Sequence, residues 1–107
     1  VKIKRFGVYW FDPSPSRGSE LKKTRPCIVV SPDEINEVLK TVLVVPVTSV
    51  VRPWPFRLNV RVMKQKSSAA CDQLRVIDKT RLKEYIEDLS AAESDALLGL
   101  LQTIFAK

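Results

Sequence analysis

The sequence predicts a mainly β protein with one C-terminal helix, in which short strands bend into a small antiparallel barrel. Short apolar or alternating runs, separated by proline-containing and polar turns, fill the chain as far as Leu89. A single helical pattern follows them. With 107 residues, of which 45% are hydrophobic, the chain is expected to form one domain, residues 1–107, with a core of its own.

The first three predicted strands are the most apolar. Residues 6–11 form an aromatic strand that ends at the turn residues beginning with Asp12. Residues 27–31 are a short run of mainly β-branched residues. Residues 41–47 are almost wholly apolar, which predicts a strand buried on both faces, and Pro46 inside it predicts a bulge or an edge position.

The second half of the predicted sheet is more polar. Residues 56–62 alternate between apolar side chains and Arg57, Asn59 and Arg61, which predicts a strand with a partly basic outer face. The remaining segments are one helical turn at 33–39, a basic turn at 64–68, a strand at 69–76 interrupted by Asp72 and Gln73, a turn at 77–81 and a last strand at 82–89.

The C-terminal helix is expected to begin at a capping box. Ser90 can accept a hydrogen bond from the amide of Glu93, while the Glu93 side chain reaches back to the cap. Apolar residues then recur at helical spacing, among them Leu97, Leu101 and Ile104. This pattern predicts a helix that packs its apolar face on the sheet.

Positive charge is concentrated in the first three quarters of the chain, although the net charge of the whole is only +6. Residues 1–83 carry 17 Lys and Arg against 7 Asp and Glu, whereas residues 84–107 carry 1 against 5. A basic surface of this kind is typical of proteins that bind polyanions, and nucleic acid is the partner we expect. A basic surface without such a partner is the simpler alternative.

The residue types that are missing argue against several classes of site. The chain has no histidine and two cysteines, Cys27 and Cys71, so serine–histidine catalysis and a zinc site are not expected. Both cysteines are expected to be buried and reduced, as in a cytoplasmic protein. The sequence shows no phosphate-binding glycine motif and no apolar run of membrane length, so we expect no cofactor, no metal and no membrane partner.

Cleavage of RNA is a reaction that this limited set of residues can support. The 2′-hydroxyl of RNA attacks the adjacent phosphorus, so the protein need not supply a nucleophile. What remains is alignment, proton transfer and positive charge for the phosphorane oxygens. Arginine, lysine, threonine, tyrosine and carboxylates are the residues of this chain that are suited to those tasks.

Arg25 and Thr48 are the candidate catalytic residues. Pro26 favours an extended backbone at Arg25, which then stands where the strand 27–31 begins, while Thr48 follows the strand 41–47. If these strands pair antiparallel, the start of one lies beside the end of the other, and one phosphate can meet both side chains. The alternatives are a surface arginine and a threonine bonded to its own backbone.

Four segments, in order and at matching spacing, resemble successive motifs of the MazF/PemK family of toxin ribonucleases, and the resemblance runs from Gly7 to the terminal helix. These segments are Arg17-Gly18-Ser19-Glu20, Thr24-Arg25-Pro26, Val44-Val45-Pro46-Val47-Thr48-Ser49 and Cys71-Asp72-Gln73-Leu74-Arg75-Val76-Ile77-Asp78-Lys79. The resemblance implies an SH3-like barrel of the MazF/PemK/CcdB type that acts as a homodimer. It also implies a MazE-like antitoxin whose acidic tail covers the RNA groove.

The activity that the resemblance implies is sequence-specific, metal-independent cleavage of single-stranded RNA, leaving 2′,3′-cyclic phosphate and 5′-hydroxyl ends. The family's catalytic arginine and threonine correspond to Arg25 and Thr48. The expected RNA-binding residues are Arg17, Gly18, Ser19, Glu20, Lys22, Lys23, Arg52, Trp54, Asp72 and Gln73. For Trp54, stacking on an unpaired base and packing in the core or a dimer are both open interpretations.

The chain departs from PemK-type members at two positions. They carry an arginine two residues before the Asp of their Cys-Asp-Gln motif, where this chain has Ala70, and a histidine in the first loop, which is absent here. Asp72 is therefore expected to be structural or to contact RNA.

Two other functions stay open, a gyrase-inhibiting toxin on the same barrel and a non-catalytic nucleic-acid-binding barrel. The gyrase class relies on a Trp-Gly-Ile tail, which differs from residues 104–107.

Overall fold

The computed structural model describes residues 2–13 and 24–107 of the chain. These residues form a mainly antiparallel β structure with a C-terminal helix, which confirms the predicted fold class. In chain order the elements are β1 (Gly7–Phe11), β2 (Arg25–Val29), α1 (Asp33–Val38), β3 (Thr41–Thr48), β4 (Arg57–Val62), β5 (Gln65–Ala70), the 3-10 helix η1 (Cys71–Gln73), β6 (Arg75–Asp78), the 3-10 helix η2 (Lys79–Arg81), β7 (Leu82–Asp88) and α2 (Ala91–Ile104).

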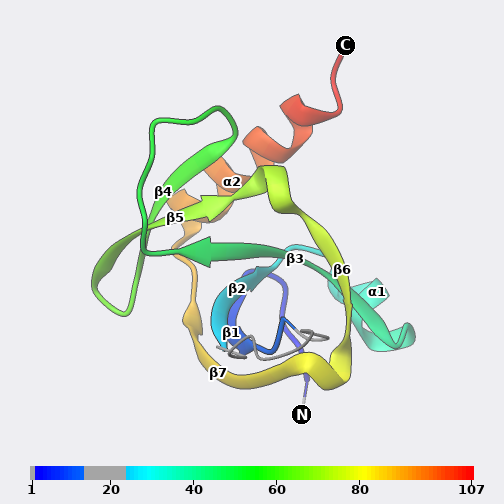
Figure 1. Cartoon of the computed structure of the whole chain (residues 1–107). Coiled ribbons are helices and arrows are strands. Elements are labelled where there is room, and N and C mark those ends of the chain that lie inside the picture. Colours follow the sequence, from blue (N-terminus) through cyan, green and yellow to red (C-terminus); the bar gives the residue numbers. More distant parts are fainter. Residues whose placement is uncertain (1, 14–23) are drawn as a thin grey trace, which may run out of the picture.

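Strand β3 lies at the centre of the sheet and pairs antiparallel with three other strands (Figure 1). β2 runs along one side of it, while β6 pairs with residues 41–44 and β5 with residues 47–48 on the other side. Pro46, which has no amide hydrogen, lies between these last two pairings. The sheet follows the order β4-β5-β3-β2-β1-β7, with β6 paired to β3 outside this path, and Figure 1 shows that the sheet is strongly bent.

Strands β2 and β3 are buried on both faces, as the apolar run at 41–47 predicts, and their alternate side chains enter two cores. The helix-side core lies beneath α2 and includes Ile28, Val45, Val47, Val60 and Leu97. The inner core lies on the opposite face of these strands and includes Phe11, Cys27, Val29, Val42 and Val44. Both faces of the central strands are therefore held in place by packing.

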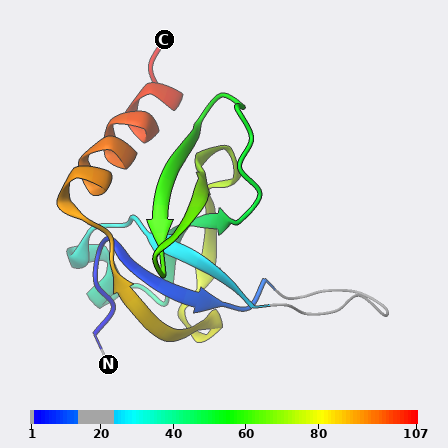
Figure 2. The ribbon, with the colours of Figure 1, turned by 90° about the vertical axis from the view of Figure 1, so that its left-hand side faces the viewer.

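The helix α2 begins at the predicted capping box and packs along β4 (Figure 2). Ser90 Oγ accepts a hydrogen bond from the Glu93 amide at 3.1 Å and donates one to the Glu93 carboxylate at 3.0 Å. The Glu93 carboxylate also accepts a 2.8 Å hydrogen bond from the Arg61 amide. The Glu87 carboxylate accepts a 2.7 Å hydrogen bond from the Met63 amide. Side chains thus cover the open edge of β4, which is a common protection against pairing with another chain.

One predicted segment is wrong. The basic turn at 64–68 is instead most of strand β5, and the turn consists of Met63 and Lys64, with φ angles of 53° and 63°. Asparagine and glycine are the usual residues of such a turn, so Met-Lys gives no signal for it. The interruption predicted at Asp72 and Gln73 within 69–76 is present, because η1 lies there and separates β5 from β6.

Cys27 and Cys71 are free and buried, as predicted. Burial raises the pKa of the Cys27 thiol to about 12 and that of the Cys71 thiol to about 11. Both thiols are therefore protonated and unreactive at neutral pH, and they act as small apolar side chains. Within residues 2–13 and 24–107, no helix combines the length and the apolar character needed to cross a membrane.

Replacing a core residue of α2 is expected to destabilise the protein, whereas a change on its exposed face is not. Leu97 is fully buried, so Leu97→Ala is expected to lower the free energy of unfolding by about 2–5 kcal/mol. Gly99 lies in the same helix, and a Cβ there would meet no other atom, so Gly99→Ala is expected to raise that free energy by about 0.5–1 kcal/mol. Urea unfolding monitored by circular dichroism measures both changes, and equal stability of the two variants would contradict the packing described.

Candidate functional site

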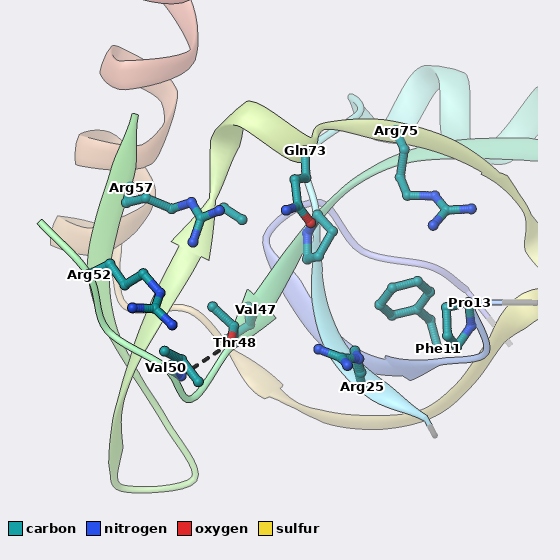
Figure 3. A pocket seen from close by; sticks show the side chains of 12 residues that line it. Phe11, Pro13, Arg25, Val47, Thr48, Val50, Arg52, Arg57, Gln73 and Arg75 are labelled. Atoms are coloured by element: carbon teal, nitrogen blue, oxygen red, sulfur yellow. Dashed lines mark hydrogen bonds between the residues drawn. The ribbon is translucent and has the colours of Figure 1, made fainter. Parts of the chain in front are cut away.

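A pocket of about 400 Å³ opens where the inner core reaches the surface. Phe11 and Pro46 contribute to its apolar lining. Its polar lining consists of Arg25, Thr48, Arg52, Arg57, Gln73 and Arg75 (Figure 3). These side chains come from β2, β3, the segment before β4, β4 itself, η1 and β6, so most of the sheet contributes to one site.

The register of β2 and β3 explains why Arg25 and Thr48 lie in the same pocket. Cys27 and Val29 point into the inner core, and Arg25 continues their face of β2 to the first residue of the strand. Cys27 lies opposite Pro46, and this antiparallel register, continued by two residues, aligns Arg25 with Thr48. The antiparallel pairing on which their convergence depends is therefore present.

Both side chains have hydrogen atoms available for a ligand. Thr48 Oγ1 accepts a 3.1 Å hydrogen bond from the Val50 amide. This is the local backbone bonding that the sequence leaves open as the alternative to a catalytic role. That bond occupies an acceptor position and leaves the hydroxyl proton free to donate. In the described part of the chain, no residue forms an ion pair with Arg25 or accepts a hydrogen bond from its guanidinium.

The pocket has a strongly positive lining. Four arginines line it, and no aspartate or glutamate is found among the described residues of its lining. Only Arg57 has a carboxylate partner among the described residues, so the charges of Arg25, Arg52 and Arg75 face the pocket uncompensated. Because a concave site lined by charges of one sign concentrates their field, the pocket is suited to a ligand with several negative charges.

Arg57 is held by the carboxylate of Asp72 through two hydrogen bonds. Its Nε donates to Oδ1 at 2.6 Å, and its Nη2 donates to Oδ2 at 3.2 Å. The Arg57 side chain is only 6% exposed, whereas that of Asp72 is 40% exposed. The hydrogen bonds from Arg57 lower the pKa of Asp72, and the Asp72 carboxylate raises the pKa of Arg57. The pair is therefore fully ionised at neutral pH.

Trp54 lies against two of the pocket arginines. The guanidinium of Arg57 is 4.8 Å from the centroid of the indole ring, and that of Arg52 is 5.1 Å from it. These distances are typical of cation–π contacts. Trp54 is 51% exposed, so it belongs to neither core.

A second pocket, of about 410 Å³, adjoins the first one and shares Arg25 and Thr48 with it. Its lining adds Trp10, which is half-buried, together with Met63 and Gln65. Arg25 and Thr48 therefore stand between a cationic cavity and one with more apolar and neutral polar groups. An extended chain that crosses this point would meet both environments.

The structure unites part of the predicted site. Arg25, Thr48, Arg52 and Gln73 line the same pocket, whereas Asp72 and Trp54 contact its arginines. The other expected RNA-binding residues lie outside the described residues: Arg17, Gly18, Ser19, Glu20, Lys22 and Lys23.

Two arginines of the pocket were not predicted as site residues. Arg57 is the first residue of β4, and Arg75 is the first residue of β6. Both lie at the start of a strand, as Arg25 does, but the sequence predicts them inside the strands 56–62 and 69–76, so no local signal marks them as pocket residues. Among residues 2–13 and 24–107, no group of three or more His, Cys, Asp or Glu side chains is placed to hold a metal ion.

A family comparison identifies the chain. The model of the PemK-like, MazF-like toxins of type II toxin–antitoxin systems matches residues 4–105. The chain belongs to this family. The match includes every described residue of the pocket, so the cationic site is part of the family domain.

Two solved MazF structures and one solved endoribonuclease structure have the same fold as this PemK/MazF-like toxin. A chain of the MazE–MazF complex of Deinococcus radiodurans aligns with a TM-score of 0.85 and 23% identity over 97% of this chain and 96% of that one. The Mycobacterium tuberculosis toxin MazF-mt6 aligns with a TM-score of 0.75 and 24% identity over 92% and 95%. A mycobacterial endoribonuclease in complex with its cognate antitoxin aligns with a TM-score of 0.74 and 18% identity over 95% and 91%. The half-barrel with its C-terminal helix is therefore the MazF fold.

The ion pair in the pocket is expected to be visible in a titration of Asp72. Its pKa should lie below the ordinary value of 3.8 and return toward it in Arg57→Ala. Because the folded pKa is lowered, ionised Asp72 stabilises the fold above its unfolded pKa, and this contribution is lost as the pH falls through the folded pKa.

Carboxyl ¹³C NMR of both proteins measures this titration. Asp88 is the internal control, because its pKa is lowered by Tyr85 and Lys4 and not by Arg57. Identical titration of Asp72 in the two proteins would show that the pair does not form in solution.

Proposed function

We propose that this toxin is a metal-independent endoribonuclease that cleaves single-stranded RNA at specific sequences. The observation that carries the proposal is the alignment of Arg25 with Thr48 in a pocket lined by four arginines. The positive charge of Arg25, Arg52 and Arg75, which have no carboxylate partner among the described residues, suits a phosphodiester, and hydrogen-bond donors on paired strands suit its transition state. The mycobacterial relative named an endoribonuclease has the same fold.

In the proposed reaction the RNA supplies its own nucleophile. The 2′-oxygen forms a bond to phosphorus and gives its proton to solvent water, while the bond from phosphorus to the 5′-oxygen breaks and that oxygen takes a proton from solvent water. The products are a 2′,3′-cyclic phosphate and a 5′-hydroxyl. Arg25 stabilises the negative charge on the phosphorane oxygens, because its planar fork binds two oxygens and keeps its proton. Thr48 donates its hydroxyl hydrogen to the same phosphate.

The partners that we propose follow from the same charge distribution. An antitoxin with acidic residues would neutralise the pocket by occupying the place of the RNA backbone, and solved MazF proteins are known in complex with MazE. A homodimer, as the family resemblance implies, would provide two such sites. The RNA sequence that is cut would depend on base contacts outside the cationic pocket, including those of the predicted loop residues 17–23.

Cleavage of a long unstructured RNA in EDTA tests the proposed function. Wild type is expected to give cyclic-phosphate ends, detected by mass spectrometry, and Arg25→Ala is expected to lower the rate by about 10²–10³-fold. Arg25→Lys keeps the charge and loses the fork, so an intermediate rate is expected. Intact RNA with a folded wild-type protein would favour gyrase inhibition or non-catalytic binding. Equal cleavage by wild type and Arg25→Ala would remove Arg25 from the reaction.

Replacement of Thr48 tests its proposed hydrogen bond separately. A hydrogen bond to a charged group contributes about 1.5–3 kcal/mol, so Thr48→Ala is expected to lower the rate at saturating RNA by about 10- to 100-fold. Thr48→Ser retains the hydroxyl and is expected to recover most of the rate. Single-turnover cleavage and binding to an uncleavable 2′-O-methyl RNA separate rate from affinity. An unchanged rate in Thr48→Ala would contradict the assignment.

A further inference from the structure

We propose that Arg57 is a second phosphate-binding residue of this pocket, and that Asp72 and Trp54 position its guanidinium. The proposal rests on the proposed function for the identity of its ligand, the sugar–phosphate backbone of RNA. The starting observation is that Arg57 is the only pocket arginine with both a carboxylate partner and an aromatic partner among the described residues.

The hydrogen bonds of Arg57 leave donors free. A guanidinium has five N–H groups, and Asp72 accepts from one on Nε and one on Nη2. Both hydrogens of Nη1 stay available, because no described residue accepts a further hydrogen bond from Arg57. Figure 3 shows this guanidinium directed from β4 into the pocket. A phosphate oxygen in the pocket therefore meets a donor that the protein does not use.

The surroundings of Arg57 also fix the plane of its guanidinium. Asp72 holds one edge, and the indole of Trp54 lies 4.8 Å away. The neighbouring residue across the β4–β5 ladder is Ala70, whose methyl group leaves space for the guanidinium beside it. Because the side chain is already ordered, less conformational entropy is lost when it binds a phosphate than for a flexible surface arginine.

A purely structural ion pair is the competing explanation. It would join β4 to η1 and need no contact with the pocket, and its loss would lower stability and activity together. The two explanations differ in what removing Asp72 does. If Asp72 only positions Arg57, Asp72→Asn removes a negative charge beside the pocket, so RNA affinity is maintained or increased while cleavage becomes slower.

The experiment compares Arg57→Ala, Arg57→Lys, Asp72→Asn and the double variant with wild type. Arg61→Ala is the matched control, because Arg61 lies on the same strand but outside this pocket. Three quantities are measured: cleavage rate at saturating RNA, affinity for 2′-O-methyl RNA as a function of salt, and melting temperature.

The expected results assign separate effects to Arg57 and Asp72. Arg57→Ala is expected to cleave at least about tenfold more slowly and to lower the slope of log affinity against log salt by about 0.7, the value for one phosphate contact on a single strand. Arg57→Lys keeps the slope and loses rate. Asp72→Asn cleaves about tenfold more slowly without weaker binding, and it has no further effect on rate in the Arg57→Ala background. Arg61→Ala cleaves at the wild-type rate.

Three results would overturn the proposal in different ways. Wild-type rate and salt slope in Arg57→Ala would mean that Arg57 contacts no phosphate. Equal rate losses for Asp72→Asn in both backgrounds would mean that Asp72 acts on RNA directly and does not position Arg57. Rate losses that follow the melting temperature would favour the structural explanation. If wild type binds but does not cleave RNA, and Arg57→Ala still lowers the salt slope, the proposed function fails while the phosphate contact is retained.

Discussion

The burial of β3 on both faces is the constraint on which the site depends. Its side chains fill two cores, and its backbone is bonded to β2 on one side and to β5 and β6 on the other. A strand held in this way cannot shift its end without breaking hydrogen bonds and opening cavities. Thr48, the last residue of β3, is therefore positioned by the whole sheet, and the pairing with β2 positions Arg25 in the same way.

The second consequence of this arrangement is electrostatic. Bringing four guanidiniums to one pocket raises the free energy of the empty protein, because their like charges repel one another. Among the described residues only Asp72 offsets part of this repulsion. A bound polyanion relieves the remaining repulsion, so the free energy that this repulsion costs the empty protein is recovered on binding. This relation favours RNA, or an acidic segment that competes with it, over a neutral ligand.

The sequence predicts the architecture well, because apolar burial follows a period that can be read directly. The run at 41–47 is buried on both faces, the capping box at Ser90 starts α2, and the strand ends at Arg25 and Thr48 share a pocket. Strand β5 escapes prediction because Gln65–Ala70 carries small and polar residues, and its burial comes from neighbours distant in sequence.

Arg57 escapes prediction for a related reason. The alternation of apolar and polar residues along β4 correctly assigns Arg57 to the face away from the helix-side core. Such a face normally meets solvent. Here η1 brings Asp72 onto that face, which turns an outer residue into a pocket residue that is only 6% exposed. Such a contact depends on tertiary geometry, which local periodicity does not report.

The absence of histidine explains why the donors of this site must be held rigidly. Arginine keeps its proton at any physiological pH, so Arg25 is suited to stabilising charge and not to removing the proton of the 2′-hydroxyl. In a chain without histidine, the rate of the proposed reaction depends strongly on holding the 2′-oxygen in line with the bond that breaks. Flexible cations would bind RNA equally well but would not enforce that geometry. Placing Arg25, Arg57 and Thr48 at strand ends meets this requirement, because each is anchored by backbone pairing next to a packed core.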